Sequence, residues 1–183
     1  LEGLKRTYRA GRAVCEGIKT AIIGKPNAGK SSLYNMLLHE NLAIVTDIAG
    51  TTRDATDTII ENQHGSFIFI DTAGIRRKSK IDEAIEKYSV IRARIAVEIA
   101  TVGVIMIDAQ EGFTEQDSKV AGLALEQGRA CIIAVNKWDA VEKDGHTMDI
   151  ERKKLMKDFS FMPYAPIVFI SAKTGQRVDR LFE

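Results

Sequence analysis

The stretch IKTAIIGKPNAGKS, residues 18–31, decides the fold that we expect for this chain. Its first six residues are almost uninterruptedly apolar, which is typical of a strand buried on both faces of a parallel sheet. The GKPNAGKS that follows has the glycine, lysine and serine spacing of a loop that wraps a phosphate group. Apolar residues then recur at helical spacing, at Leu33, Met36 and Leu37. The sequence therefore predicts a strand, a phosphate-binding loop and a helix, in that order.

Each part of this loop has a task that suits its chemistry. Glycines let the backbone curl, so that successive N–H groups and the start of the helix surround the β-phosphate of a nucleotide. Lys30 can neutralise the β- and γ-phosphates, and the Ser31 hydroxyl can ligate Mg²⁺. A plain turn with Ser31 as a helix cap is the alternative, which the strand-to-helix context disfavours. The expected nucleotide-binding residues of the loop are Gly24, Asn27, Ala28, Gly29, Lys30, Ser31 and Ser32.

Further apolar stretches predict the rest of a sheet. They lie at Phe67–Ile70, Val102–Ile107, Cys131–Val135 and Ile167–Ile170. The β-branched segment Thr56–Glu61, followed by Asn62-Gln63-His64-Gly65, predicts a hairpin with the first of them. We therefore expect a three-layer α/β fold with a mostly parallel six-stranded sheet and one antiparallel edge strand. In such a fold, ligands bind beyond the carboxyl ends of the strands.

Two apolar stripes predict helices that cover this sheet. One stripe consists of residues three to four positions apart: Ile85, Tyr88, Ile91, Ile95 and Ile99. The other follows Thr114-Glu115 and consists of Val120, Leu123 and Ala124. We expect each stripe to face the sheet.

Length and composition limit the number of domains and the kinds of partner that we expect for this chain. The 183 residues include 26 basic and 25 acidic ones, so the formal charge of +1 excludes a general binder of polyanions. Cys15 and Cys131 lie far apart, which fits a reducing compartment. No apolar run reaches the roughly 20 residues of a membrane span, so we expect a cytoplasmic protein. We expect residues 1–16 to form a flanking helix and residues 17–183 to form one domain of a longer protein.

Two loops after strands have the residues needed to recognise a purine base. Asn136-Lys137-Trp138-Asp139 follows an apolar stretch, and the Asp139 carboxylate can accept from both the ring N–H and the exocyclic amine of guanine. Adenine offers no matching pair of donors. Asn136 is expected to tie loops together, and the Lys137 stem to cover the base. Ser171-Ala172-Lys173 is expected to place the Ala172 N–H near the guanine oxygen.

Two further segments predict a response to the γ-phosphate. Asp71-Thr72-Ala73-Gly74 ends a predicted strand, where Asp71 can hold Mg²⁺ through water and the Gly74 N–H can meet the γ-phosphate. Upstream, residues 46–54 form a polar, glycine-containing loop. We expect Thr52 of this loop to complete the Mg²⁺ shell.

Together and in this order, these motifs resemble translation-factor-type P-loop GTPases, in the bacterial group that includes the Era, MnmE and Der families. Five segments closely resemble the second GTPase domain of the Der family: DTAGIRRK (71–78), IEKYSVIRA (85–93), EGFTEQD (111–117), NKWD (136–139) and YAPIVFISA (164–172). Three others resemble at least as closely the start of the MnmE GTPase domain: YRAGR (8–12), EGIK (16–19) and AIVTDIAG (43–50).

The resemblance implies a potassium site. In this group, the asparagine of the phosphate loop and carbonyls of the first switch hold K⁺ against the phosphates. By position, these are Asn27 and the carbonyls of Thr46, Ile48 and Gly50. A fixed cation there would offset the charge that develops during phosphoryl transfer.

The resemblance does not determine which residue orients the attacking water. Ile75 occupies the place where Ras-like enzymes have a glutamine, and an apolar side chain cannot position water. MnmE proteins supply a glutamate farther along the second switch, for which Glu86 is the nearest match and Glu83 competes. The expected catalytic residues are therefore Asn27, Lys30, Thr52, Gly74 and Glu86.

These implications predict a slow, Mg²⁺-dependent and K⁺-stimulated GTPase with a Der-like role in assembly of the large ribosomal subunit. A nucleotide-gated binding module with negligible hydrolysis is one alternative. Another is an MnmE-like domain for tRNA wobble-uridine modification, in which two GTPase domains pair when GTP and K⁺ are present. The basic run at residues 76–80 either contacts RNA or forms a solvated loop.

Overall fold

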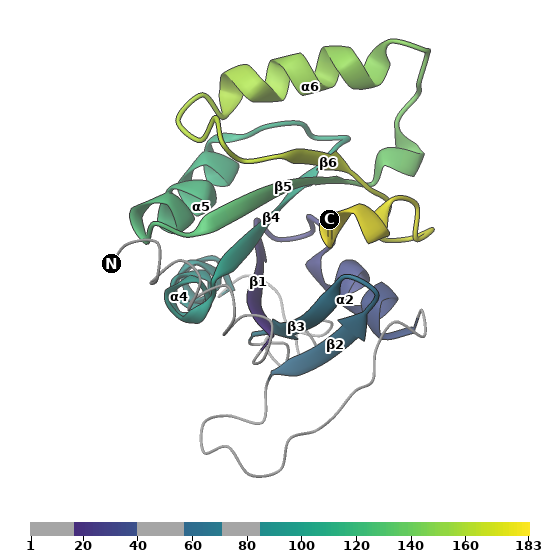
Figure 1. Cartoon of the computed structure of the whole chain (residues 1–183). Coiled ribbons are helices and arrows are strands. Elements are labelled where there is room, and N and C mark those ends of the chain that lie inside the picture. The colour runs from purple at the N-terminus through teal and green to yellow at the C-terminus, as the bar shows by residue number, and fades with distance from the viewer. Residues whose placement is uncertain (1–16, 40–56, 71–84) are drawn as a thin grey trace, which may run out of the picture.

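The structure is a computed structural model that describes residues 17–39, 57–70 and 85–183, with only the backbone of residues 85–90 and 92. One mixed sheet runs through these ranges in the strand order β2-β3-β1-β4-β5-β6 (Figure 1). The strands are β1 (Ile18–Gly24), β2 (Thr58–Asn62), β3 (Gly65–Phe69), β4 (Val102–Asp108), β5 (Ala130–Asn136) and β6 (Ile167–Phe169). The helices are α2 (Lys30–His39), α4 (Ile85–Ile99), α5 (Glu115–Glu126) and α6 (Thr147–Asp158), with 3-10 turns η1 (Trp138–Ala140) and η2 (Val178–Leu181).

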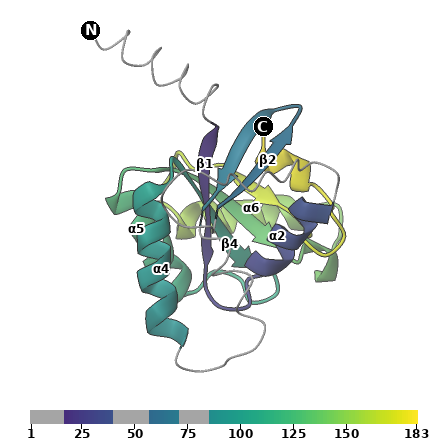
Figure 2. The same cartoon turned by 90° about the horizontal axis from the view of Figure 1, so that it is seen from below.

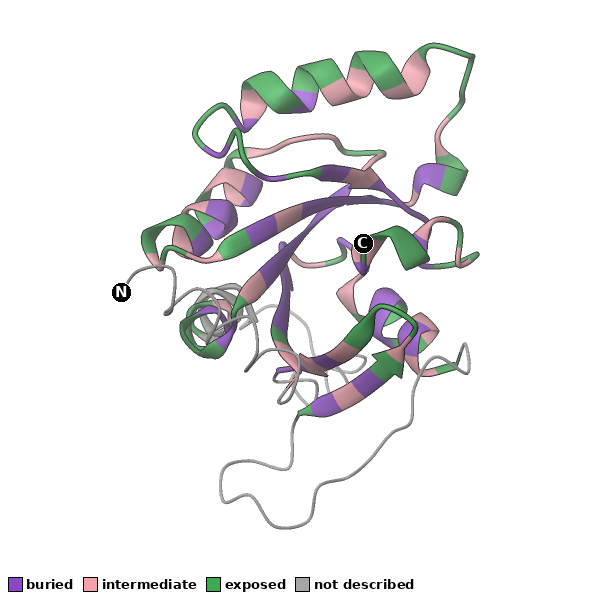
Figure 3. Ribbon diagram, viewed as in Figure 1, coloured by how far each residue is buried: buried purple, intermediate pink, exposed green. Residues whose placement is uncertain are grey.

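The sheet has the predicted direction of its strands. Strand β1 pairs in parallel with β3 on one side and β4 on the other, and β4, β5 and β6 continue in parallel. Among the described strands, only β2 and β3 pair antiparallel, and β2 lies at one edge of the sheet. The central strands β1, β4 and β5 are buried along most of their length (Figure 3). Their uninterrupted apolar sequence therefore reflects burial on both faces.

The predicted hairpin is present, with a tighter turn than the sequence indicated. Asn62 and Gly65 pair with each other at the ends of β2 and β3, so Gln63 and His64 alone form the loop. The Asn62 side-chain oxygen accepts a hydrogen bond from the His64 N–H at 2.8 Å. The asparagine side chain thereby stabilises the turn locally.

Two apolar clusters pack on the two faces of the sheet. One cluster joins the sheet to α4, α5 and α6, through residues such as Val97, Val120 and Leu155. The other joins it to α2 and η2, through Leu33, Tyr34 and Val178 among others. Figure 2 shows α4 and α5 side by side, with α2 at the opposite side of the strands. The predicted three-layer fold is therefore confirmed.

The predicted apolar face of α5 agrees with the structure. Val120 and Ala124 are buried, Ala121 joins them, and Leu123 is half-buried. Thr114 caps the helix, because its side chain accepts from the Asp117 N–H while the Asp117 carboxylate accepts from the Thr114 N–H. This capping box explains why the helix begins where it does.

The predicted face of α4 was wrong, although the helix itself is present. Ile91, Ile95 and Ile99 are each half or more exposed, at 55%, 52% and 50%. The α4 residues that pack on the core are instead Ala93, Ala96 and Val97, followed by Ala100 directly after the helix. These four also recur at helical spacing, so periodicity fitted both faces, and small side chains let α4 lie close to the sheet. Side-chain orientations of Ile85 and Tyr88 lie outside what the structure describes.

Candidate nucleotide-binding site

The phosphate loop joins β1 to α2 through backbone conformations that favour glycine. Gly24 has φ +152° and Gly29 has φ +96°, and Asn27 between them is left-handed at φ +63°. A Cβ atom on Gly29 would lie 2.0 Å from the Asn136 side-chain nitrogen, and one on Gly24 would lie 2.6 Å from the Met106 carbonyl oxygen. Neither position can carry a side chain without moving its neighbours. The predicted strand, loop and helix therefore meet as the motif requires.

Lys30 is bound to the carbonyl groups of its own loop. Its ammonium nitrogen, Nζ, donates to the Gly24 carbonyl at 2.8 Å and to the Lys25 carbonyl at 2.6 Å. The Ala28 N–H approaches the same Lys25 carbonyl at 3.4 Å. These bonds place a positive charge beside the curled backbone, as phosphate binding requires.

Asn136, at the end of β5, joins three loops through one buried side chain. Its Nδ2 donates to the Ala28 carbonyl of the phosphate loop at 2.9 Å. Its Oδ1 accepts from the Ala172 N–H of the loop after β6, also at 2.9 Å. A carbonyl only accepts and an N–H only donates, so these partners fix which way the amide points. The predicted role of Asn136 in tying loops together is thus seen in its contacts.

Asp139 presents an exposed carboxylate at the same edge of the sheet. A hydrogen bond from the Ser171 side chain lowers the pKa of Asp139 and outweighs the small opposing effect of burial. The group is therefore an acceptor-only carboxylate at neutral pH, which is the form that can receive two donors from a base.

Other residues of the base loop pack and bond against neighbouring elements. Trp138 is buried against Phe169, with ring centroids 4.4 Å apart, and the Trp138 backbone N–H donates to the Ile170 carbonyl at 3.1 Å. Lys137 adopts a left-handed backbone with φ +63°, and its ammonium pairs with Asp108 at the end of β4. Lys173 is exposed. A guanine oxygen approaching Ala172 would share the N–H that Asn136 already uses.

Several predicted site residues lie outside the described residues. These are Thr46, Ile48, Gly50, Thr52, Asp71 and Gly74, together with Ile75, Glu83 and the basic run at residues 76–80. Glu86 lies on α4, where only its backbone is described. Asn27, Ser31 and Ser32 are exposed at the phosphate loop and the start of α2. The metal ligands and the water-orienting residue therefore stay predictions.

The structure adds charged residues that the sequence reasoning missed. Lys25, in the phosphate loop, is 5% exposed and pairs with Glu111 and Asp117, and Asp108 pairs with Lys137. The spacing of Thr114 and Asp117 was a usable signal, because it is that of a capping box. Nothing in the sequence pattern indicated that the cap would also contact the phosphate loop.

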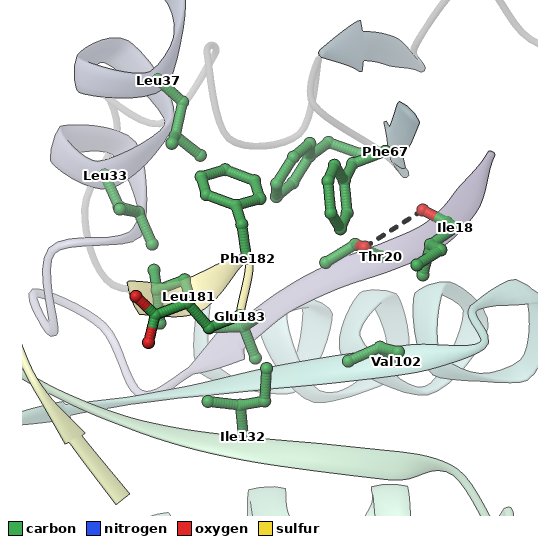
Figure 4. A pocket seen from close by; sticks show the side chains of 12 residues that line it. Ile18, Thr20, Leu33, Leu37, Phe67, Val102, Ile132, Leu181, Phe182 and Glu183 are labelled. Carbon is green, nitrogen blue, oxygen red and sulfur yellow. Dashed lines mark hydrogen bonds between the residues drawn. The ribbon is translucent and has the colours of Figure 1, made fainter. Parts of the chain in front are cut away.

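A separate hollow of about 180 Å³ lies away from these loops, between α2, the sheet and the residues after η2 (Figure 4). Its walls are mostly apolar, with Leu33, Leu37, Phe67 and Phe182 among them. The Thr20 hydroxyl in its wall already donates to the Ile18 carbonyl at 3.1 Å. The described residues that line it bring no converging set of polar groups that could orient a nucleotide. In the described ranges, no helix is long and apolar enough to cross a membrane.

Comparisons with known proteins agree with this geometry. Residues 19–137 match the family model described as 50S ribosome-binding GTPase. The chain is 61% identical over 165 residues to a protein named GTPase Der from Acetivibrio thermocellus, an alignment that covers 90% of this chain and 38% of that protein. It is 59% identical over 165 residues to GTPase Der from Agathobacter rectalis, covering 90% of this chain and 37% of the relative. The chain thus spans little more than a third of these relatives.

A solved structure shares the fold. It is Era in complex with MgGDPNP and nucleotides of 16S ribosomal RNA, with a TM-score of 0.65 and 29% identity. The match covers 88% of this chain and 53% of Era. Together with the phosphate loop and the base loop joined by Asn136, the family match over most of the sheet leads to one conclusion. The chain belongs to the family of 50S ribosome-binding GTPases.

Proposed function

We propose that this chain carries a GTPase domain, residues 17–183, that binds guanine nucleotides and hydrolyses GTP to GDP and phosphate. The observation that carries the proposal is the Asn136 side chain, which bonds the phosphate loop at Ala28 and the loop after β6 at Ala172. Lys30 begins the helix that follows β1, and Asp139 lies in the 3-10 turn that follows β5, so both come after the carboxyl ends of parallel strands. Ligands of open α/β sheets bind beyond those ends.

Asp139 would select the base. Its ionised carboxylate can accept from the ring N–H and the exocyclic amine of guanine together. Adenine lacks this pair of donors, and sites built to bond a substrate group reject analogues that lack it by about 10⁴-fold. One exposed carboxylate would therefore separate GTP from ATP.

Lys30 and a divalent cation would receive the phosphates. The exposed Ser31 hydroxyl stands in the first turn of α2, directly after the phosphate loop, where its oxygen suits Mg²⁺. Thr52 and Asp71 would complete that shell. When bound, Mg²⁺ neutralises charge on the β- and γ-phosphates. Lys30 would add a second positive charge, held in place by the Gly24 and Lys25 carbonyls.

Asn27 would supply a side-chain ligand for K⁺, with the carbonyls of Thr46, Ile48 and Gly50. Its amide is exposed on the loop, and its left-handed backbone suits asparagine. When bound, K⁺ offsets charge that develops on the phosphates. Glu86 is the candidate for orienting the attacking water.

GTP turnover in potassium and in sodium chloride tests hydrolysis and the cation together. We expect the wild type to turn over about tenfold faster in potassium, equivalent to ~1.4 kcal/mol of barrier. Asn27→Gly, which keeps the positive φ without strain, should abolish that difference. Equal wild-type rates in both salts would remove K⁺ from the mechanism while leaving the GTPase proposal intact.

The proposed partner is the large ribosomal subunit, in the cytoplasm. The description of the matching family names the 50S ribosome, and the similar Era structure contains ribosomal RNA. Cosedimentation with purified subunits in GTP, GDP and nucleotide-free states should differ between states. Negligible turnover with GTP-dependent cosedimentation would favour a gated binding module. Dimers that require both GTP and K⁺ in sedimentation velocity would favour the pairing of two domains.

A further inference from the structure

Lys25 is a buried cation in the middle of the phosphate loop. Only 5% of its surface is exposed, and its ammonium lies 2.8 Å from Glu111 Oε2 and 3.4 Å from Asp117 Oδ2. The Thr114 hydroxyl is 3.5 Å away. Lysine is almost never buried unless a carboxylate accompanies it, so these contacts explain its position. All three partners belong to the segment between β4 and the first turn of α5.

That segment is itself held in place by hydrogen bonds and an ion pair. Asp117 is 1% exposed, and its Oδ2 accepts from the Thr114 N–H at 2.9 Å and from the Thr114 hydroxyl at 2.6 Å. At its other end, the Ala109 N–H donates to the Asn136 carbonyl at 2.9 Å, and Asp108 pairs with Lys137. The segment is thus fixed both to α5 and to the base loop.

The ammonium of Lys25 stays charged in this place. Burial acts to lower the pKa of Lys25, but the hydrogen bond to Glu111 and the charge of Asp117 outweigh it, and the pKa is raised. Among the described residues, Lys25 is the cation paired with the buried Asp117 carboxylate. The pair would be costly to break, because the remaining charge would stay buried.

The backbone of Lys25 holds the residue that would meet the phosphates. The Lys25 carbonyl accepts from Lys30 Nζ at 2.6 Å, so a shift of Lys25 would shift the Lys30 ammonium. We propose that Lys25 is a positioning residue for phosphate binding: its side chain anchors the loop to the start of α5, so that its carbonyl holds Lys30 in place. The inference rests on the proposed guanine-nucleotide binding and adds a residue that touches no nucleotide.

Glu111→Gln tests the anchor without disturbing the core, because Glu111 is 57% exposed. Glu115→Gln is the matched control. Glu115 also lies 2.8 Å from a lysine, Lys119, but that pair stands on the outer surface of α5. Dissociation constants of GDP, GTP and GMP are measured with Mg²⁺ for the wild type and both variants, alongside thermal melting without nucleotide.

We expect Glu111→Gln to weaken GDP and GTP by about threefold, as loss of a partly exposed ion pair does, and Glu115→Gln to change neither. GMP binding should stay unchanged, because GMP lacks the β-phosphate that the loop surrounds. When Lys25 is already replaced in Lys25→Met, adding Glu111→Gln should not weaken GDP binding further. Lys25→Arg, which keeps a positive charge, should bind GDP more tightly than Lys25→Met does.

Two results would overturn the inference. One is equal behaviour of Glu111→Gln and Glu115→Gln towards GDP. The other is an equal loss for GMP and GDP, which would indicate a general effect on folding. Either result with tight wild-type GDP binding leaves the proposed function standing, whereas a wild type that binds no guanine nucleotide overturns the function itself.

Discussion

The phosphate loop and the base loop meet at one site but are built by different means. The phosphate loop depends on backbone conformation, with positive φ at Gly24 and Gly29 and carbonyl groups that hold Lys30. The base loop depends on side chains, namely the buried amide of Asn136 and the exposed carboxylate of Asp139. Phosphate binding should therefore be sensitive to an atom added at Gly24 or Gly29, whereas the choice of base should be sensitive to the identity of single side-chain atoms.

The largest effect should come from adding one methyl group to the phosphate loop. In Gly29→Ala, the new Cβ would lie 2.0 Å from Asn136 Nδ2, at a φ of +96° that alanine rarely adopts. We expect binding of GDP and GTP to fall by more than about 10³-fold, because the loop must open and the Asn136 bridge must break. Isothermal titration with both nucleotides measures this loss.

Gly122→Ala is the control, because a Cβ there meets nothing within 4 Å and the residue lies within helix α5. It should leave nucleotide binding unchanged and stabilise the helix by up to about 1 kcal/mol. Wild-type affinity in Gly29→Ala would contradict the backbone description of this loop.

The second largest effect should come from Asp139→Asn, which should change which base the site prefers. In Asp139→Asn, one acceptor oxygen becomes a donor, so the site loses the guanine amine and gains the second oxygen of xanthine. We expect GTP affinity to fall by about 10²- to 10⁴-fold and xanthosine triphosphate to bind better than GTP. Competition between the two triphosphates checks it, with Asp149→Asn on α6 as the control. An unchanged preference would show that Asp139 does not contact the base.

Asn136→Ala should affect both loops, because the side chain bonds each of them. Its removal leaves the Ala28 carbonyl and the Ala172 N–H without their present partner, and we expect a loss of about 2–4 kcal/mol in unfolding free energy. Denaturant unfolding measures it. Asn62→Ala, which removes a bond in the exposed hairpin turn, should cost less than about 1 kcal/mol. Equal losses in the two variants would contradict the bridging role.

The smallest effect should appear as a pH dependence at the base loop. Burial acts to raise the pKa of Asp108, but the Lys137 and Gln110 bonds outweigh it, so the pKa is lowered from its ordinary 3.8. A depressed carboxyl pKa stabilises the fold above the ordinary value, and that contribution is lost as pH falls through the folded pKa. Asp108→Asn should therefore lower the unfolding free energy by about 1–2 kcal/mol at pH 7, and this loss should become smaller as the pH is lowered below about 4. A cost that stays constant down to pH 3 would contradict this pairing.

The sheet and the two loops were predictable because local sequence determines them. Short apolar stretches mark strands buried on both faces, and the phosphate loop is read from the spacing of Gly24, Gly29, Lys30 and Ser31 between a strand and a helix. The resemblance to the Der family also agrees with the curated relatives. The likeness of three N-terminal segments to MnmE stays a prediction, because those segments lie mostly outside the described residues.

Two features could not be predicted, for different physical reasons. The α4 face was misjudged because isoleucines outweigh alanines in hydrophobicity, whereas close helix packing favours small residues such as Ala96 and Ala100. The ion pairs of Lys25 and Lys137 join residues 92 and 29 positions away, at Asp117 and Asp108. Tertiary pairing at that separation leaves no periodic pattern in the sequence.

Equilibrium binding of GDP and ADP to the same protein tests the central claim most directly. Mixed in turn with each nucleotide and Mg²⁺, the wild-type chain should bind GDP tightly and ADP at least about 10³-fold more weakly, because only guanine offers two donors to Asp139. Equal affinities for the two, or no binding of GDP, would contradict the assignment of a guanine-nucleotide site.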